Sequence, residues 1–220
     1  MKRILIACEC SGTVRDAFTR RGWDAWSCDL QPSQTPGQHI QGDAIEAIRH
    51  GMDGKPWDFV IAHPPCTYLA SMGIWWNAKR PERWASTYAA KSFVEQIWAM
   101  PVRYMALENP IGYLNKNWMK PTQIINPWQF GHEAHKPTCL WLRNISPLQP
   151  TKIVGRGEFY VKANGSRVSA WSHKQSGTNK SKRAGIAAKT FPGIAEAMAE
   201  QWSRPELKTM TLFEPLGISL

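Results

Sequence analysis

Short apolar runs alternate with stretches of helical character over the first 145 residues, and this alternation constrains the fold most strongly. The apolar runs are Arg3–Cys8, Ala25–Cys28, Trp57–Ala62 and Arg103–Leu107, and helical patterns cover Arg15–Arg21 and Pro81–Met100. Gly22 and the Pro81-Glu82 pair are suited to ending and beginning these helices. Strands that alternate with helices form mostly parallel sheets, because a parallel crossover needs a long connection. We therefore predict an α/β, Rossmann-like fold with helices on both faces of the sheet.

The alternation becomes weaker toward the C-terminus. Gln123–Phe130 and Thr138–Leu142 resemble two further strands, which could pair as a hairpin. Residues 147–190 are rich in turn-forming and basic residues and contain one strand-like piece, Glu158–Val161. Phe191–Trp202 has apolar residues spaced by four and is expected to be helical. A length of 220 residues corresponds to one domain, so residues 147–190 are interpreted as an insertion within a single domain, 1–220.

Positive charge is concentrated in that insertion. The chain has 27 Lys and Arg against 17 Asp and Glu, a net charge of +10. Glu158 is the one acidic residue in the sequence 151–190, which holds many Lys and Arg residues. A block of one sign repels itself, and contact with phosphates would offset this cost. We predict nucleic-acid contacts there, the alternative being a solvated basic loop; the candidates are Lys162, Arg167, Lys174, Lys180, Lys182 and Arg183.

The composition excludes several other classes. With 43% hydrophobic and 20% charged residues, the chain is globular and not disordered. No apolar run reaches the length of a membrane span, and the first run turns polar at Glu9, too early for a signal peptide. Five scattered cysteines argue against a disulfide framework and a zinc site. We expect a cytoplasmic protein with no membrane association and no metal.

Two groups of residues follow the first strands, at the edge where parallel sheets bind ligands. The turn Cys8-Glu9-Cys10-Ser11-Gly12 is built of small residues that would let a cofactor approach the backbone, or it is simply a tight turn. Asp29 ends the second strand, where an acid commonly binds ribose hydroxyls. Asp43 could contact an adenine amino group. Either carboxylate could instead cap a helix or lie in a loop.

Two further strand ends carry reactive side chains. In His63-Pro64-Pro65-Cys66-Thr67, the prolines would hold Cys66 rigidly beyond the strand, as a nucleophile rather than a buried structural cysteine. Glu108, in Ala106-Leu107-Glu108-Asn109-Pro110, follows a buried strand, so we expect its pKa to be raised. Such a carboxyl could hydrogen-bond to, or protonate, a ring nitrogen, the alternative being an exposed acid in a loop.

Together these motifs resemble the DNA cytosine carbon-5 methyltransferases. The family's Pro-Pro-Cys loop is matched by Pro64-Pro65-Cys66 and its Glu-Asn pair by Glu108-Asn109. Ile4–Gly12 is similar to the family's cofactor motif, and Gly193 to a glycine near its C-terminus. Where the family has Gln-x-Arg-x-Arg, this chain has Ala134, Lys136 and Thr138. The resemblance is greatest to small phage-encoded members that lack a full target-recognition domain, whose place residues 147–190 would take.

The resemblance implies an S-adenosyl-L-methionine-dependent methyltransferase fold and a complete mechanism. Cys66 would attack carbon 6 of cytosine, Glu108 would bind N3 and the exocyclic amine, and Asn109 would orient the nucleophile loop. The methyl group would pass from S-adenosyl-L-methionine to carbon 5, and proton loss would release Cys66. The implied cofactor residues are Cys8, Glu9, Cys10, Ser11, Gly12, Asp29, Asp43 and Pro64, and Lys136 and Thr138 would lie at the DNA. The resemblance also implies that the protein is located in the cytoplasm of a bacterial host.

Double-stranded DNA is the expected substrate and single-stranded DNA the alternative, with short or relaxed sequence specificity. Trp75 and Trp76 could stack on bases, although packing in the core is the commoner fate of tryptophan. A noncatalytic nucleic-acid-binding protein on the same fold remains an alternative, because the arginine motif and the recognition domain are missing. Amino-methyltransferases would need an acid or amide before the two prolines, where this chain has His63.

Overall fold

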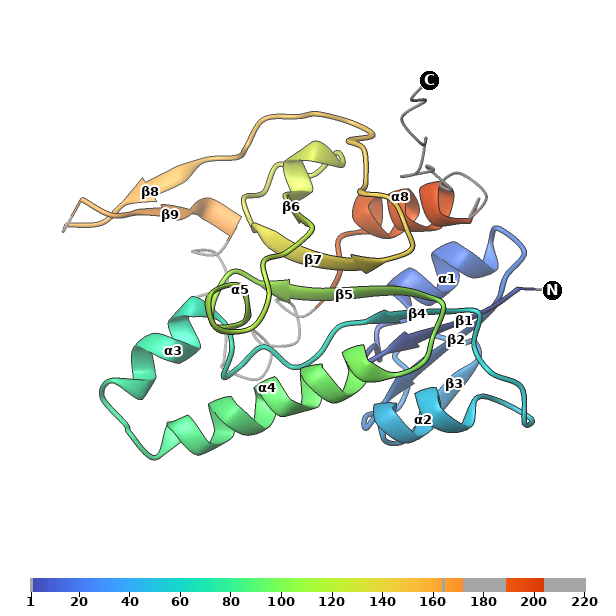
Figure 1. Ribbon diagram of the computed structural model, residues 1–220. Helices are drawn as coiled ribbons and strands as arrows, with labels where there is room; N and C mark the ends of the chain where they lie inside the picture. The colour runs from blue at the N-terminus through green and yellow to red at the C-terminus, as the bar shows by residue number, and fades with distance from the viewer. Residues whose placement is uncertain (1, 164, 172–188, 204–220) are drawn as a thin grey trace, which may run out of the picture.

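The computed structural model describes residues 2–163, 165–171 and 189–203 and contains one central sheet (Figure 1). Its seven strands lie in the order β3-β2-β1-β4-β5-β7-β6. They are β1 Arg3–Ala7, β2 Asp24–Asp29, β3 His39–Gln41, β4 Phe59–Ala62, β5 Tyr104–Pro110, β6 Gln123–Ile125 and β7 Thr138–Arg143. The first five in this order are parallel, whereas β7 runs antiparallel to β5 and β6. The predicted α/β fold with a mostly parallel sheet is confirmed.

The strand order places a binding edge next to β1. Strands β2 and β3 extend the sheet on one side of β1, and β4 and β5 extend it on the other. Order 3-2-1-4-5 is that of a doubly wound sheet, in which ligands bind beyond the strand ends where the order reverses. The turn after β1 and the loop after β4 flank this point, and the backbone N–H of His63 donates to the carbonyl of Ala7 across it.

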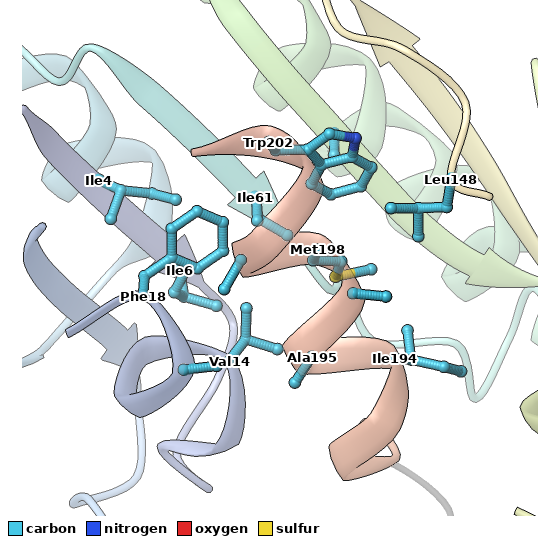
Figure 2. Packing of buried hydrophobic residues seen from close by; sticks show 14 of the residues in the cluster. Ile4, Ile6, Val14, Phe18, Ile61, Leu148, Ile194, Ala195, Met198 and Trp202 are labelled. Carbon is cyan, nitrogen blue, oxygen red and sulfur yellow. The ribbon is translucent and has the colours of Figure 1, made fainter. Parts of the chain in front are cut away.

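Helices α1 (Thr13–Thr19) and α8 (Pro192–Trp202) cover one face of the sheet. Side chains alternate along β1, so Ile4 and Ile6 face these helices and pack with Phe18, Met198 and other apolar residues (Figure 2). The segment predicted as Phe191–Trp202 is thus a helix of the core, with Phe191 as its N-cap residue. This explains why its apolar residues recur every four positions.

Helices α2 (Ala44–His50) and α4 (Arg83–Ala99) cover the opposite face. Leu5 and Ala7 of β1 point into this second layer, with Val94 and Ile97 of α4. Burial on both faces accounts for the uninterrupted apolar character of β1 and β4, since a strand with two dry faces needs no polar side chain. The prediction of a helix over Pro81–Met100 is confirmed, with its first turn beginning at Arg83.

The structure corrects several boundaries. Strand β5 runs through Glu108 and Asn109 to Pro110 and does not end at Leu107, because β7 pairs with it along that length. Strand β6 ends at Ile125 and does not continue to Phe130, because Pro127 begins a short 3₁₀ helix, η1 (Pro127–Gln129). Further elements, which the apolar pattern did not predict, are α2, α3 (Ser71–Asn77), α5 (Leu114–Asn117) and β9 (Arg167–Ser169). All four elements are short. The three short helices among them depend on tertiary contacts, which a local sequence pattern does not record.

The basic insertion contributes a two-stranded ribbon. Strand β8 (Phe159–Val161) pairs antiparallel with β9, and Figure 1 shows this ribbon extending away from the central sheet. Strand β8 agrees with the predicted piece Glu158–Val161. Over the part of the chain that the structure describes, no helix is both long and apolar enough to cross a lipid bilayer.

Candidate active site

The nucleophile loop is held against the end of β5 by one buried side chain. The Asn109 side-chain amide donates to the carbonyl oxygen of Pro64 over 2.9 Å, and Asn109 is 1% exposed. The Cys66 carbonyl accepts hydrogen bonds from the backbone N–H groups of Leu69 and Ala70. This turn leads directly into α3. The loop is therefore fixed on both sides of Cys66, which is half-buried beside the sheet edge.

Glu108 lies beside Cys66, and its charge acts on the thiol. Burial favours the neutral form of the Glu108 carboxyl, but His63, Lys136 and the Thr138 side chain stabilise the carboxylate and lower its pKa below its usual range. The expectation of a raised pKa is therefore wrong. A strand end alone predicts burial, whereas the stabilising groups come from a loop after another strand and from the segment that enters β7. At neutral pH Glu108 is an anion.

Cys66 has the opposite tendency. Burial and the nearby Glu108 carboxylate raise the pKa of its thiol, while Lys136 opposes them. Cys66 is therefore a neutral thiol at neutral pH in the free protein. A reaction that uses its thiolate needs a step that removes this proton.

His63 is a site residue to which the sequence analysis gave no role. Its Nδ1 atom lies 3.6 Å from Oε2 of Glu108, too far for a direct hydrogen bond, and its side chain is 8% exposed. Neither ring nitrogen has a hydrogen-bond partner within the described residues. Buried polar atoms normally have hydrogen-bond partners, so two unpaired ring nitrogens make His63 a candidate functional residue. A histidine directly after a buried apolar strand was the available signal.

Cys8, Asp29 and Asp43 come together at the ends of β1, β2 and β3. Both carboxylates act on the Cys8 thiol, and with burial they raise its pKa. Burial and the same two acids raise the pKa of Cys28 to about 11. Asp29 accepts a hydrogen bond from the backbone of Gln31, and Asp43 caps α2 through the amides of Ile45 and Glu46. Asp43 is thus a helix cap, one of the roles that the sequence left open.

The turn after β1 is less open than its small residues suggested. Glu9 is buried, and its carboxylate accepts hydrogen bonds from the backbone N–H groups of Val14 and Arg15 at the start of α1 and from the Ser11 hydroxyl. Gly12 is buried beneath Thr35, and an added Cβ would lie 2.2 Å from the Thr35 hydroxyl. In this structure Thr35 and Arg15 thus cover the side of Gly12 that a cofactor was expected to approach. Cys10 and Ser11 remain half-buried.

A buried arginine holds this cover in place. Arg15 of α1 is 1% exposed and donates hydrogen bonds to Ser33, to Thr35 and to the carbonyl of Pro36. Its Nε also pairs with the Asp16 carboxylate. The sequence analysis missed this role, although Arg15 falls on the apolar face of α1 with Val14 and Phe18. A charge on such a face indicates a buried network.

The predicted nucleic-acid residues are divided among three places. Lys136 and Thr138 lie at the Glu108 site, and Nζ of Lys136 is 5.7 Å from the ring centroid of Trp171. In the β8–β9 ribbon, Lys162 is exposed just after β8 and Arg167 is exposed at the start of β9. Lys174, Lys180, Lys182 and Arg183 lie outside the described residues. Among the described residues, no group of three or more side chains could hold a metal ion.

Of the comparisons with known proteins, the one with solved structures gives matches, and one of these is a weak similarity to a structure with a functional description. No family model matches the chain, and no curated protein does. A solved E. coli structure described as a "putative DNA modification methyltransferase encoded within prophage" matches with 13% identity and a TM-score of 0.46. The match covers 70% of this chain and 52% of that one, so the chain spans about half the length of that structure. At this level the reaction has to be inferred from the side chains themselves.

Proposed function

We propose that this protein transfers a methyl group from S-adenosyl-L-methionine to carbon 5 of cytosine in DNA, through a covalent bond to Cys66. One observation carries the proposal. A cysteine in a fixed loop after β4 and an ionised carboxylate on the neighbouring strand β5 lie together, with Asn109 joining the two segments. A thiol and an acid in one buried site suit a reaction in which a nucleophile attacks one atom of a ring while another atom of that ring is protonated.

Cys66 is the nucleophile in this mechanism. Its thiol proton passes to the Glu108 carboxylate and from there to N3 while the sulfur forms a bond to carbon 6, so no charge accumulates on the ring. The cofactor supplies the methyl group that carbon 5 receives. Loss of the proton from carbon 5 to solvent then restores the double bond and expels the Cys66 thiolate. The N3 proton returns to the Glu108 carboxylate and from there to the departing thiolate.

His63 serves this mechanism by positioning Glu108. Because Glu108 is an anion in the free protein, it must gain a proton before it can give one to N3. The His63 ring faces the carboxylate with both nitrogens unpartnered. Its Nδ1 atom, 3.6 Å from Oε2, is placed to hold the carboxylate in position after a small closing movement. His63 is thus a positioning residue behind Glu108.

The residues at the sheet edge suit the nucleoside half of the cofactor. Asp29 at the end of β2 offers carboxylate oxygens for ribose hydroxyls at the reversal of strand order. Cys8, half-buried at the end of β1, lies near Asp29, and the loop that contains Pro64 carries Cys66. Glu9 and Gly12 are excluded from this set because the chain occupies their exposed sides.

DNA is the proposed substrate because the cations of the β8–β9 ribbon and Lys136 suit a polyanion. Lys162 and Arg167 are placed to contact phosphates, which gives affinity without reading sequence. A two-stranded ribbon of this size offers little surface for base readout. We therefore expect relaxed sequence specificity.

The test is methylation of cytosine-containing DNA with tritiated S-adenosyl-L-methionine, followed by nucleoside chromatography. Label should appear in 5-methylcytosine, and Cys66→Ala should abolish it while DNA and cofactor binding persist. DNA with 5-fluorocytosine should become covalently linked to Cys66, because fluorine at carbon 5 prevents the proton loss that releases the thiolate. Label in another nucleoside, or methyl transfer by Cys66→Ala, would overturn the mechanism.

A noncatalytic DNA-binding protein is the second candidate, favoured by the covered turn after β1. Here Glu9 occupies the amides at the start of α1, and Thr35 closes over Gly12. Titration calorimetry with S-adenosyl-L-methionine separates the two functions. Binding that Asp29→Ala weakens supports the enzyme, whereas DNA binding without any cofactor binding supports the second candidate.

A further inference from the structure

Helix α3 carries two exposed tryptophans beside the Cys66 turn. Trp75 and Trp76 are 51% and 40% exposed, whereas the other ten tryptophans of the chain are buried or half-buried. Core packing, the commoner fate considered from the sequence, therefore does not explain this pair. Large exposed aromatic surface in a chain that buries its other tryptophans indicates a binding surface.

The inner face of α3 explains why these rings point outward. Gly73 and Asn77, four residues apart, are the buried residues of the helix. The Asn77 side-chain amide donates to the Thr87 hydroxyl of α4 over 2.8 Å. An added Cβ on Gly73 would lie 2.2 Å from the carbonyl oxygen of Thr67, so the helix approaches the nucleophile loop as closely as a glycine permits. With this face fixed, Trp75 and Trp76 are held away from the protein.

Close backbone packing fixes α3 relative to Cys66. Residue Gly112, just beyond β5, approaches so closely that an added Cβ would lie 2.0 Å from the Leu69 carbonyl oxygen. The Ser71 hydroxyl donates to the carbonyl of Ile111 over 2.9 Å. Helix α3 begins at Ser71 and rises about 1.5 Å per residue, so Trp75 lies about 6 Å along its axis. The rings are thus within the reach of a few nucleotides from Cys66.

The surface around the rings is both hollow and positively charged. A cleft of about 280 Å³ lies between α3 and α5, lined by Trp75, Tyr113, Lys116 and Asn117 among others. Nζ of Lys79 is 4.4 Å from the Trp75 ring centroid, and the guanidinium of Arg80 is 5.6 Å from that of Trp76. Trp75 and Trp76 meet edge to face, so their faces point in different directions. We call Trp75, Trp76, Lys79, Arg80 and Lys116 the α3 surface.

We propose that the α3 surface binds unpaired bases and phosphates of single-stranded DNA and directs that strand to Cys66. This inference names the form of the substrate and rests on the proposed function. Aromatic rings bordered by cations suit single strands, because every unpaired base offers a face for stacking and every linkage a phosphate. In a duplex the base faces are stacked on one another and are unavailable. A strand without pairing also needs no base flipping, whose cost is a few kcal/mol.

The test measures DNA binding apart from catalysis. Cys66→Ala protein, without cofactor, is titrated into a short fluorescent oligonucleotide, either single-stranded or annealed to its complement. We expect preferential binding to the single strand. Trp75→Leu with Trp76→Leu should weaken that binding about fivefold or more for each lost stack. Trp75→Phe with Trp76→Phe keeps a ring at each position and should retain most of the affinity.

Ile124→Ala provides the control, because Ile124 is an exposed apolar residue on β6, away from α3. It should leave the affinity unchanged. Equal binding by the double leucine variant, or equal weakening for duplex and single strand, would overturn the inference. So would dissociation of a dimer by that variant in sedimentation, since the surface would then join two copies. Single-strand binding through α3 with no methylation by the wild type would instead refute the proposed reaction alone.

Discussion

The Asn109 side-chain amide donates a 2.9 Å hydrogen bond to the Pro64 carbonyl, which joins β5 to the loop that carries Cys66. Pro64 and Asn109 are 45 residues apart in the chain. Because Asn109 is buried, this bond is shielded from water and fixes the loop two residues before Cys66. The same strand that presents Glu108 thus positions the nucleophile, so the acid and the thiol share one rigid support.

Asn109→Ala should uncouple that support. The buried Pro64 carbonyl would lose its partner, at a cost of about 1–3 kcal/mol in the free energy of unfolding. Urea denaturation measures this loss, and Asn117→Ala, whose amide bonds an exposed carbonyl within α5, should cost much less. Methylation should fall further than stability predicts. Wild-type activity in a stable Asn109→Ala protein would show that the bond does not position Cys66.

The reactivity of Cys66 should respond in opposite directions to its two charged neighbours. Glu108 raises the pKa of the thiol and Lys136 lowers it. Glu108→Gln should therefore increase the rate of alkylation of Cys66 by iodoacetamide at pH 8, and Lys136→Met should decrease it. Peptide mapping identifies the alkylated cysteine. The wild-type rate should still be rising at pH 9, and a rate that has already levelled off at neutral pH would contradict the raised pKa.

His63 should control the acid stability of the protein through Glu108. The pKa of Glu108 is lowered in the folded state from an ordinary value of 4.5. Its ionisation therefore stabilises the fold above that value, and this contribution disappears as the pH falls through the folded pKa. In His63→Leu, fewer groups oppose the effect of burial on the Glu108 carboxyl, so its pKa rises. The loss of stability on acidification then begins at a higher pH.

Urea denaturation between pH 3 and pH 7 checks this shift. The comparison is repeated in a Glu108→Gln background, where His63→Leu should no longer change the pH dependence. If the shift persists without Glu108, another group causes it. For catalysis, His63→Gln should lower kcat with little change in the KM for DNA, whereas a loss explained by reduced stability alone would contradict a positioning role.

Arg15 should be the most costly arginine to remove from the first helix. Arg15→Ala leaves several hydrogen-bonding groups of residues 33–36 without a donor and should destabilise the protein by about 3 kcal/mol or more. Arg20→Ala, on the same helix, breaks an exposed ion pair with Glu196 and should cost less than about 1 kcal/mol. Chemical denaturation of both variants gives the comparison. Similar losses would mean that Arg15 does not hold this loop.

The β8–β9 ribbon should contribute phosphate contacts. Lys162→Ala with Arg167→Ala should weaken DNA binding similarly for all sequences. It should also reduce the slope of log affinity against log salt by about 0.7 per lost contact on single strands. Binding isotherms at several salt concentrations measure the slope. An unchanged slope would place the DNA elsewhere on the surface.

Much of the fold followed from the sequence because its signals are local. Apolar runs bounded by glycine, proline and charge predicted β1, β4 and β5, and a four-residue repeat predicted α8. Burial on both faces imposes that pattern whatever the details of the fold. The position of Cys66 just beyond β4 followed in the same way, because residues next to a strand are fixed by the strand, whereas Glu108 lies within β5 and not after it.

Only the tertiary structure decided which groups surround those residues. The lowered pKa of Glu108 depends on His63 and Lys136, which come from different segments. The covering of Gly12 depends on Arg15, and the exposure of Trp75 and Trp76 depends on the close packing of Gly73 against Thr67. Charge, burial and exposure are set by neighbours distant in the chain, and a sequence pattern records only neighbours along it.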